Sequence, residues 1–219
     1  LMGCSEKKYG GFTVSGKVSH AGAQKIYLQE LPFAGSEPLI LDSATLKENG
    51  KFELRATALE EGLYRLTLER GPEVLVINDE KSIRVNIDVN QPRAYEIESS
   101  EASKSLQTLF AKYSVADSTL MITFNNLDKA QQQTGNDSLL QVLKKERDNG
   151  LVAINNLVNN FITSSNSPAA IYYAIGMATR TMTQEAIKQL VDKSATKFKE
   201  HTGLAKICLL YTSPSPRDV

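Results

Sequence analysis

The residue types that most often carry chemistry are few in this chain of 219 residues. There are two histidines, His20 and His201, and two cysteines, Cys4 and Cys208, one near each end. The histidines lie far apart in the sequence and in polar, turn-like surroundings, so we expect both at the surface rather than in a Ser-His-Asp arrangement. No Cys-x-x-Cys pair occurs, and no cysteine or histidine stands at the spacing of zinc ligands. We therefore predict no catalytic residue, no metal site and no cofactor.

Two pairs of adjacent residues could still line a site. Glu60-Glu61 could act as paired carboxylates in acid–base chemistry. Because they stand just before Gly62, between two expected strands, we expect a solvated turn instead. Tyr172-Tyr173, close to Gly176, could line a groove, but packing against neighbouring helices is the favoured interpretation.

The first four residues, Leu1-Met2-Gly3-Cys4, resemble a bacterial lipobox. An aliphatic residue stands three positions before the cysteine and a small residue directly before it, where a peptidase pocket needs a small side chain. A polar tether follows, and the basic and apolar regions of a signal peptide are missing, as in a chain clipped close to maturation. A chance Leu-x-Gly-Cys is the alternative. The resemblance implies lipidation of Cys4 and a membrane-anchored protein of a Gram-negative cell envelope, on the periplasmic side or at the cell surface.

A short pattern of Asp, Ser and then a small, apolar or threonine residue occurs three times, at 42–44, 117–119 and 137–139. It resembles the acceptor pattern for O-glycosylation in some envelope bacteria, which would make Ser43, Ser118 and Ser138 acceptors. Three residues are a weak pattern, because Asp-Ser also serves turns and helix caps through local hydrogen bonds.

Charge and hydropathy exclude several classes of protein. Lysine plus arginine and aspartate plus glutamate each total 25, so the net charge is zero. With no basic run, nothing indicates binding to nucleic acid. No apolar stretch approaches the roughly 20 residues that a membrane-spanning helix needs. The length suits one large domain or two small ones.

Residues 11–99 alternate between apolar and polar side chains, with turn residues at short intervals. Tyr64, Leu66 and Leu68, for example, are expected to face inward. Asn49-Gly50 is the strongest hairpin signal and should join a strand at 39–46 to one at 51–54. About eight short strands predict an antiparallel β-sandwich. No βαβ pattern occurs, so we expect no Rossmann-type nucleotide site.

The apolar period changes to three and four at Ser99-Ser100-Glu101. One stripe runs from residue 106 to 127 and a second from 140 to 161, after a break at Gly135-Asn136 where Asn136 or Asp137 can act as cap. Ser167 should cap a third helix with Pro168 in its first position, and a fourth should run from Thr183 to near Gly203. Such helices need partners and should form a bundle or pack on the sandwich. The predicted fold is α+β, with a tether at 1–10, a β-sandwich domain at 11–99 and a helical domain at 100–207.

Several short segments, taken in order, resemble a known family. They are Phe12–Val18, Ile26–Leu28, Leu41–Ala44, Gly50–Leu54 and Leu63–Leu66, after the lipobox. Together they resemble the uncharacterised β-domain at the front of bacterial thioredoxin-like lipoproteins of the TlpA/ResA and AhpC/TSA type. In those proteins a helical segment follows, and then a thioredoxin domain with a Cys-x-x-Cys pair. The similarity runs through residues 4–207, and 198–205 resembles the helix end shortly before the thioredoxin domain. Because that domain is missing here, the resemblance implies that this chain by itself is no enzyme, whereas its parent would be a thiol–disulfide oxidoreductase.

The last twelve residues, CLLYTSPSPRDV, are interpreted separately. A disordered terminus or a docking peptide is one interpretation. In one reading frame, however, codons for residues 208–218 resemble the transposon end and adapter of tagmentation sequencing libraries. We therefore expect 208–219 to be translated adapter, with the gene fragment cut near Ile207 and a longer natural protein. On that interpretation Cys208 has no role in disulfide or nucleophile chemistry.

These observations lead to one expected function and two rivals. The first is a non-catalytic accessory region of an envelope-anchored thiol–disulfide oxidoreductase, which spaces, docks or presents substrate to the missing thioredoxin-like domain. The alternative is a stand-alone envelope lipoprotein whose sandwich binds a glycan or a protein partner, since fold alone cannot choose between these roles. A purely structural surface lipoprotein is the third.

Overall fold

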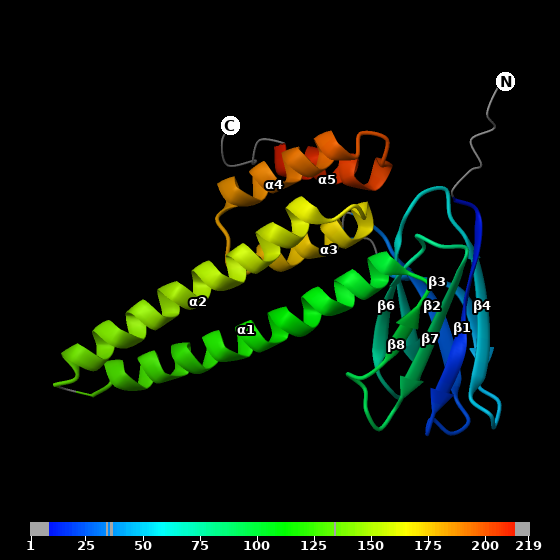
Figure 1. The fold of residues 1–219 in the computed structure, drawn as a ribbon, viewed down its shortest axis with the longest axis horizontal. Coiled ribbons are helices and arrows are strands. Elements are labelled where there is room, and N and C mark those ends of the chain that lie inside the picture. The colour runs from blue at the N-terminus through cyan, green and yellow to red at the C-terminus, as the bar shows by residue number, and fades with distance from the viewer. Residues whose placement is uncertain (1–8, 34, 36, 134, 213–219) are drawn as a thin grey trace.

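The computed structural model describes residues 9–33, 35, 37–133 and 135–212 of the chain (Figure 1). Within these residues eight strands come first and five helices follow, which confirms the α+β class and the order of its two parts. The strands are β1 (Gly11–Ser19), β2 (Lys25–Leu31), β3 (Leu39–Thr45), β4 (Lys51–Thr57), β5 (Leu63–Leu68), β6 (Glu73–Ile77), β7 (Ser82–Asp88) and β8 (Glu96–Glu98). The helices are α1 (Glu101–Gln131), α2 (Asp137–Ser164), α3 (Pro168–Ala178), α4 (Gln184–Lys197) and α5 (Thr202–Thr212).

The strands form two four-stranded sheets, in the orders β4-β1-β7-β8 and β3-β2-β5-β6. Neighbouring strands are antiparallel except β1 and β7, which run parallel and which periodicity alone did not predict. The inner faces of the sheets share one apolar core, and Tyr64, Leu66 and Leu68 are buried in it as predicted. Alternate residues point to opposite faces of a strand, so this burial follows directly from the two-residue period.

A turn is present at Asn49-Gly50, but the predicted hairpin is wrong. β3 pairs with β2 and β4 pairs with β1, so the turn carries the chain from one sheet to the other. Gly50 has φ of 69°, and its carbonyl accepts a hydrogen bond from the amide of Val18 at 2.9 Å. A β-carbon at Gly50 would lie 2.0 Å from the Val18 carbonyl oxygen. Glycine is therefore required both by the backbone conformation and by the close approach of β1.

The helix starts follow the local capping chemistry. The side chains of Ser100, Ser167 and Thr183 each accept a hydrogen bond from the amide of the third residue of α1, α3 and α4 respectively, as N-caps do. Pro168 occupies the first turn of α3, as predicted. Asn136 holds the N-cap position of α2, but its side chain makes no capping hydrogen bond.

The predicted fourth helix is two helices. α4 ends at Lys197 and α5 begins at Thr202, so a prediction of one helix reaching Gly203 is wrong. The new start is stabilised from outside the helix, because the amides of Thr202 and Gly203 donate to the carboxylate of Glu60, on the sandwich. Glu60 and Thr202 are 142 residues apart, so no local sequence pattern could predict that α5 begins there.

α1 and α2 form a long hairpin that extends away from the sandwich, and α3, α4 and α5 pack along its near half (Figure 1). Leu63 and Ile77 of the sandwich belong to the same apolar cluster as the helices, so the helical part packs directly on the sandwich. The amide of Ile77 also donates to the hydroxyl of Ser103 in α1 at 2.8 Å. Among the helices within the described residues, none has the length and apolar character to cross a membrane.

Candidate functional site

Polar groups gather at the contact between sandwich and helices, where Glu60, Glu61, Ser167 and His201 form what we call the sandwich–helix junction. Glu61 is buried, with 3% of its surface exposed. One carboxylate oxygen accepts hydrogen bonds from the Ser167 hydroxyl at 2.5 Å and from the Ala169 amide at 3.2 Å. The expectation of a solvated turn is therefore wrong for Glu61. The Ala169 amide lies at the N-terminus of α3, where amide groups have no acceptor inside the helix.

Glu60 performs the same task for α5. Its carboxylate accepts from the Thr202 amide at 2.8 Å, the Thr202 hydroxyl at 2.6 Å and the Gly203 amide at 3.1 Å. Partial burial works to raise the pKa of Glu60, but the hydrogen bonds from Thr202, the nearby His201 and the Gly203 amide together lower it below its ordinary value.

His201 lies buried at the same junction, so the prediction of a surface histidine is wrong for it. Its Nε2 lies 2.7 Å from the Glu61 carbonyl oxygen, and its Nδ1 lies 3.2 Å from the Leu204 amide, which donates to it. Each ring nitrogen therefore meets a backbone group, which fixes the orientation of the imidazole. Both ring nitrogens face backbone groups and the Ser167 hydroxyl faces Glu61, so these residues form no catalytic triad. The junction is a structural clamp.

His20, in contrast, lies at the surface as predicted. Its side chain is 60% exposed, and its Nδ1 lies 2.8 Å from a carboxylate oxygen of Asp88. The two histidines thus differ in role although both were expected in turns.

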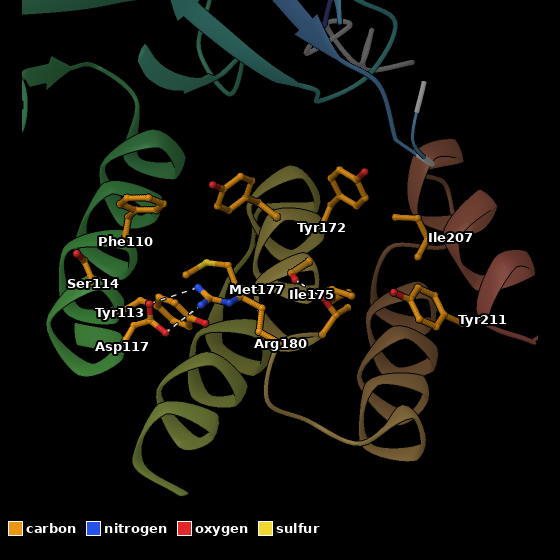
Figure 2. A pocket seen from close by; sticks show the side chains of 13 residues that line it. Phe110, Tyr113, Ser114, Asp117, Tyr172, Ile175, Met177, Arg180, Ile207 and Tyr211 are labelled. Carbon is orange, nitrogen blue, oxygen red and sulfur yellow. Dashed lines mark hydrogen bonds and ion pairs between the residues drawn. The ribbon is translucent and has the colours of Figure 1, made fainter. Parts of the chain in front are cut away.

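A cavity of about 670 Å³ opens between α1, α3 and α5 (Figure 2). We call it the aromatic cavity, because five of its lining residues carry aromatic rings. It is lined by Phe110, Tyr113, Ser114, Asp117, Tyr172, Tyr173, Ile175, Gly176, Met177, Thr179, Arg180, Ile207 and Tyr211. Its volume falls within the range of about 300–1,000 Å³ that is typical of small-molecule sites.

Tyr172 and Tyr173 take part in packing and also line the cavity. The Tyr172 ring stands 4.4 Å, centre to centre, from that of Phe33, and the Tyr173 ring stands 6.5 Å from that of Phe110. The favoured packing interpretation is therefore confirmed, and the groove interpretation was right as well. Gly176 also lines the cavity, where it contributes backbone atoms only.

An ion pair forms one edge of the aromatic cavity. The Arg180 guanidinium lies 3.3 Å from an Asp117 carboxylate oxygen, and Figure 2 shows the two side chains reaching toward each other from different elements. The guanidinium carbon also stands 6.0 Å from the centre of the Tyr113 ring. The pair is partly exposed, so it contributes little to stability. The ion pair therefore places the Arg180 guanidinium, a strong hydrogen-bond donor, beside the Asp117 carboxylate, a strong acceptor.

The hydroxyl of Tyr113 is the one buried side-chain polar atom without a hydrogen-bond partner in the part of the chain that the structure describes. The residue is 6% exposed. Burial raises the pKa of Tyr113. The positive charge of Arg180 lowers this pKa, and the negative charge of Asp117 raises it. Arg180 is thus the charged group beside the hydroxyl, although no hydrogen bond between them meets the full geometric criteria. Buried polar groups are rarely left unpaired, so this atom indicates a position where a ligand group can bind.

The other predicted sites are scattered. Cys4 lies outside the described residues. The side chains of Ser43, Ser118 and Ser138 are all exposed, on β3, α1 and α2 respectively. No group of three or more His, Cys, Asp or Glu side chains in the described ranges is arranged to hold a metal ion.

Cys208 lies in α5, partly buried. Its sulfur stands 3.9 Å from the Val191 carbonyl oxygen and from a carboxylate oxygen of Asp192. Burial, and then the charge of Asp192, raise the pKa of the Cys208 thiol. The described part of the expected adapter segment, 208–212, continues α5, and 213–219 lie outside the described residues.

Sequence reasoning found only the part of the aromatic cavity that Tyr172-Tyr173 and Gly176 line. Phe110 and Tyr113 were placed in an apolar stripe, and Asp117 in an Asp-Ser-Thr triplet. Tyr113 and Asp117 are four residues apart and so share a helix face, which is the only local signal. Arg180, 63 residues further on, gives none.

Comparison with known proteins adds one match. A family model described as "Domain of unknown function (DUF4369)" matches residues 12–106. That range covers the sandwich from β1 to the start of α1, and every residue that lines the aromatic cavity lies beyond it. The chain matches none of the curated proteins with which it was compared.

Proposed function

We propose that this chain is the non-catalytic front region of an envelope-anchored thiol–disulfide oxidoreductase, and that it spaces, docks or presents substrate to a thioredoxin-like domain that follows it. The observation that carries the proposal is the family match over residues 12–106, joined to a helical segment in the order that the thioredoxin-like lipoproteins have. The lipobox-like residues before the sandwich support the same order.

The sandwich–helix junction supports a spacing role. Glu60 and Glu61 fix the starts of α5 and α3 to the sandwich, and Ser103 fixes α1 to β6. Three separate attachments make a stiff connection, and a stiff spacer holds a following domain at a set distance and orientation from the membrane.

The membrane anchor in this proposal is a lipid on Cys4. When the protein is produced from its native gene, Cys4→Ser is expected to move it from the detergent-extracted membrane fraction to the soluble fraction. Thr57→Ser, at an exposed position of β4, is the control and should stay with the membrane. Equal membrane association of all three proteins would refute lipidation of Cys4.

The decisive experiment is to sequence the source DNA across the codon for Ile207, from a library prepared without transposon adapters. A reading frame that continues into a thioredoxin pattern with two cysteines is the expected result. A continuation without those cysteines, or an immediate stop codon, would end the redox proposal. A repeat of CLLYTSPSPRDV in that read would show that the tail is a natural terminus.

The second candidate function is a stand-alone envelope lipoprotein that binds a glycan or a protein partner. The aromatic cavity favours it, because a pocket of this volume with a buried, unpaired hydroxyl is a feature of binding proteins and is not needed in a spacer. The same DNA read separates the two candidates, since only the first requires a cysteine pair downstream.

A further inference from the structure

We propose that the aromatic cavity binds a short, uncharged oligosaccharide, whose sugar rings lie on the aromatic side chains and whose hydroxyl groups meet Tyr113, Asp117 and Arg180. The inference goes beyond the spacing role and does not depend on it. It rests on the composition of the walls, the charge of the cavity edge and the unpaired hydroxyl.

The walls supply flat apolar faces. Phe110 and Tyr113 come from α1 and Tyr172 and Tyr173 from α3, and all four line the cavity. Figure 2 shows Phe110 and Tyr113 on α1 and Tyr172 on α3. The C–H faces of a sugar ring are apolar and pack against aromatic rings, while its hydroxyl groups project around the rim. Tyr211 also lines the cavity and belongs to segment 208–219, but these four rings lie outside that segment.

The charge at the cavity edge is balanced. Arg180 would attract an anion if it stood alone, but Asp117 lies 3.3 Å away and offsets it. A carboxylate or phosphate ligand attracted by Arg180 is therefore repelled by Asp117, and an ammonium ligand attracted by Asp117 is repelled by Arg180. A hydroxyl group both donates and accepts, so it can bond to the carboxylate and to the guanidinium at once. The ion pair thus favours a neutral ligand with several hydroxyls.

The walls also disfavour an extended peptide. A bound strand needs free backbone groups along its groove, whereas the cavity is walled by helices whose backbone bonds are internal. At the C-terminus of α3 the exposed carbonyls are already used, because the amides of Thr179, Arg180 and Thr181 donate back to Ile175, Met177 and Ala178. Side chains, not backbone, make up the polar surface here.

The Tyr113 hydroxyl then gains a role. It is buried and unpaired, and it lies on the cavity wall beside the ion pair. A ligand hydroxyl placed next to Arg180 would supply the missing partner. Loss of such a hydrogen bond costs about 1 to 1.4 kcal/mol, or a five- to tenfold weaker affinity.

The test is calorimetric titration of the full chain with three neutral trisaccharides: cellotriose, maltotriose and tri-N-acetylchitotriose. We expect at least one to bind. Tyr113→Phe should weaken that binding about five- to tenfold while thermal stability stays equal or rises, because the variant removes an unpaired buried hydroxyl. Tyr27→Phe is the matched control. It removes a hydroxyl bonded to Glu69 on the sandwich, far along the chain from the cavity, and should bind as the wild type does.

Asp117→Asn provides a second measurement. It keeps the shape of the side chain but leaves Arg180 without its counter-charge, so trisaccharide binding should weaken and binding of decanoate, an anionic amphiphile, should appear. The proposal is overturned if no trisaccharide binds, if Tyr113→Phe binds as tightly as Tyr27→Phe, or if the wild type binds decanoate alone. None of these results bears on the cysteine pair that the redox proposal requires, so the two can fail separately.

Discussion

The carboxylate of Glu61 lies 2.5 Å from the hydroxyl of Ser167, a residue 106 positions later in the chain. Both side chains are buried, and the same carboxylate oxygen also accepts from the Ala169 amide. One side chain on the sandwich therefore caps a helix of the other part of the protein. This contact couples the stability of α3 to the sandwich.

Removal of that carboxylate should destabilise the whole chain. Glu61→Ala leaves the Ser167 hydroxyl and the Ala169 amide buried without their acceptor, and we expect a free energy of unfolding lower by about 2 to 3 kcal/mol. Glu61→Gln keeps an acceptor oxygen and should cost less. Urea denaturation followed by circular dichroism measures both, and Glu48→Ala, at an exposed position, is the control, with an expected change within about 0.5 kcal/mol. If Glu61→Ala and Glu48→Ala are equally stable, Glu61 does not fasten α3.

The lowered pKa of Glu60 predicts that the stability of the folded chain depends on pH. Its pKa in the folded chain lies below the ordinary value of 4.5, so the folded state binds fewer protons than the unfolded state in this range. The stability that Glu60 contributes is complete above its unfolded pKa and is lost as the pH falls through the lower, folded pKa. We expect the unfolding free energy of the wild type to fall more between about pH 6 and about pH 3 than that of Glu60→Gln. Parallel curves for the two proteins, with Glu48→Gln as control, would contradict this account.

Periodicity predicted much of the fold because burial in this protein is regular. Tyr64, Leu66 and Leu68 face inward because a strand alternates its side chains, and Ser167 followed by Pro168 starts α3 because their chemistry suits the first turn. Such effects act within a few residues, so a single sequence is enough to find them.

Contacts between distant segments were beyond the same reasoning. Glu61 has the sequence context of a surface turn and becomes buried only because α3 begins beside it. β3 and β4 join different sheets although a good turn connects them, since strand pairing depends on which faces the whole sandwich buries. Arg180 joins the aromatic cavity only through the packing of α3 against α1.

The turn between the sheets gives a third prediction. Gly50→Ala places a methyl group 2.0 Å from the Val18 carbonyl oxygen and also requires a positive φ, so β1 or the turn must shift. Gly22→Ala requires a similar φ of 64° but meets no atom within 4 Å. We expect Gly22→Ala to cost about 1 kcal/mol and Gly50→Ala about 2 kcal/mol more than that. Thermal unfolding of the two variants measures the difference. Equal melting temperatures would show that the approach of β1 to Gly50 is relaxed in solution.

The three Asp-Ser triplets differ in a way that only the structure reveals. Ser43 lies on β3, which is the outer strand of its sheet, with an exposed side chain. The Ser118 hydroxyl donates to the Ser114 carbonyl inside the long helix α1. A glycosyltransferase must take its acceptor hydroxyl into an active site, and an exposed edge strand presents an extended segment more readily than a helix interior.

If these triplets are acceptors, we therefore expect Ser43 to carry sugar and Ser118 to carry none in protein isolated from its native host. Intact-mass analysis gives the total added mass, peptide mapping assigns it, and Ser43→Ala should remove it. No added mass on Ser43, Ser118 or Ser138 would end the glycosylation hypothesis. Sugar on Ser118 with none on Ser43 would instead mean that modification precedes folding, because α1 in its folded state holds that hydroxyl against its own backbone.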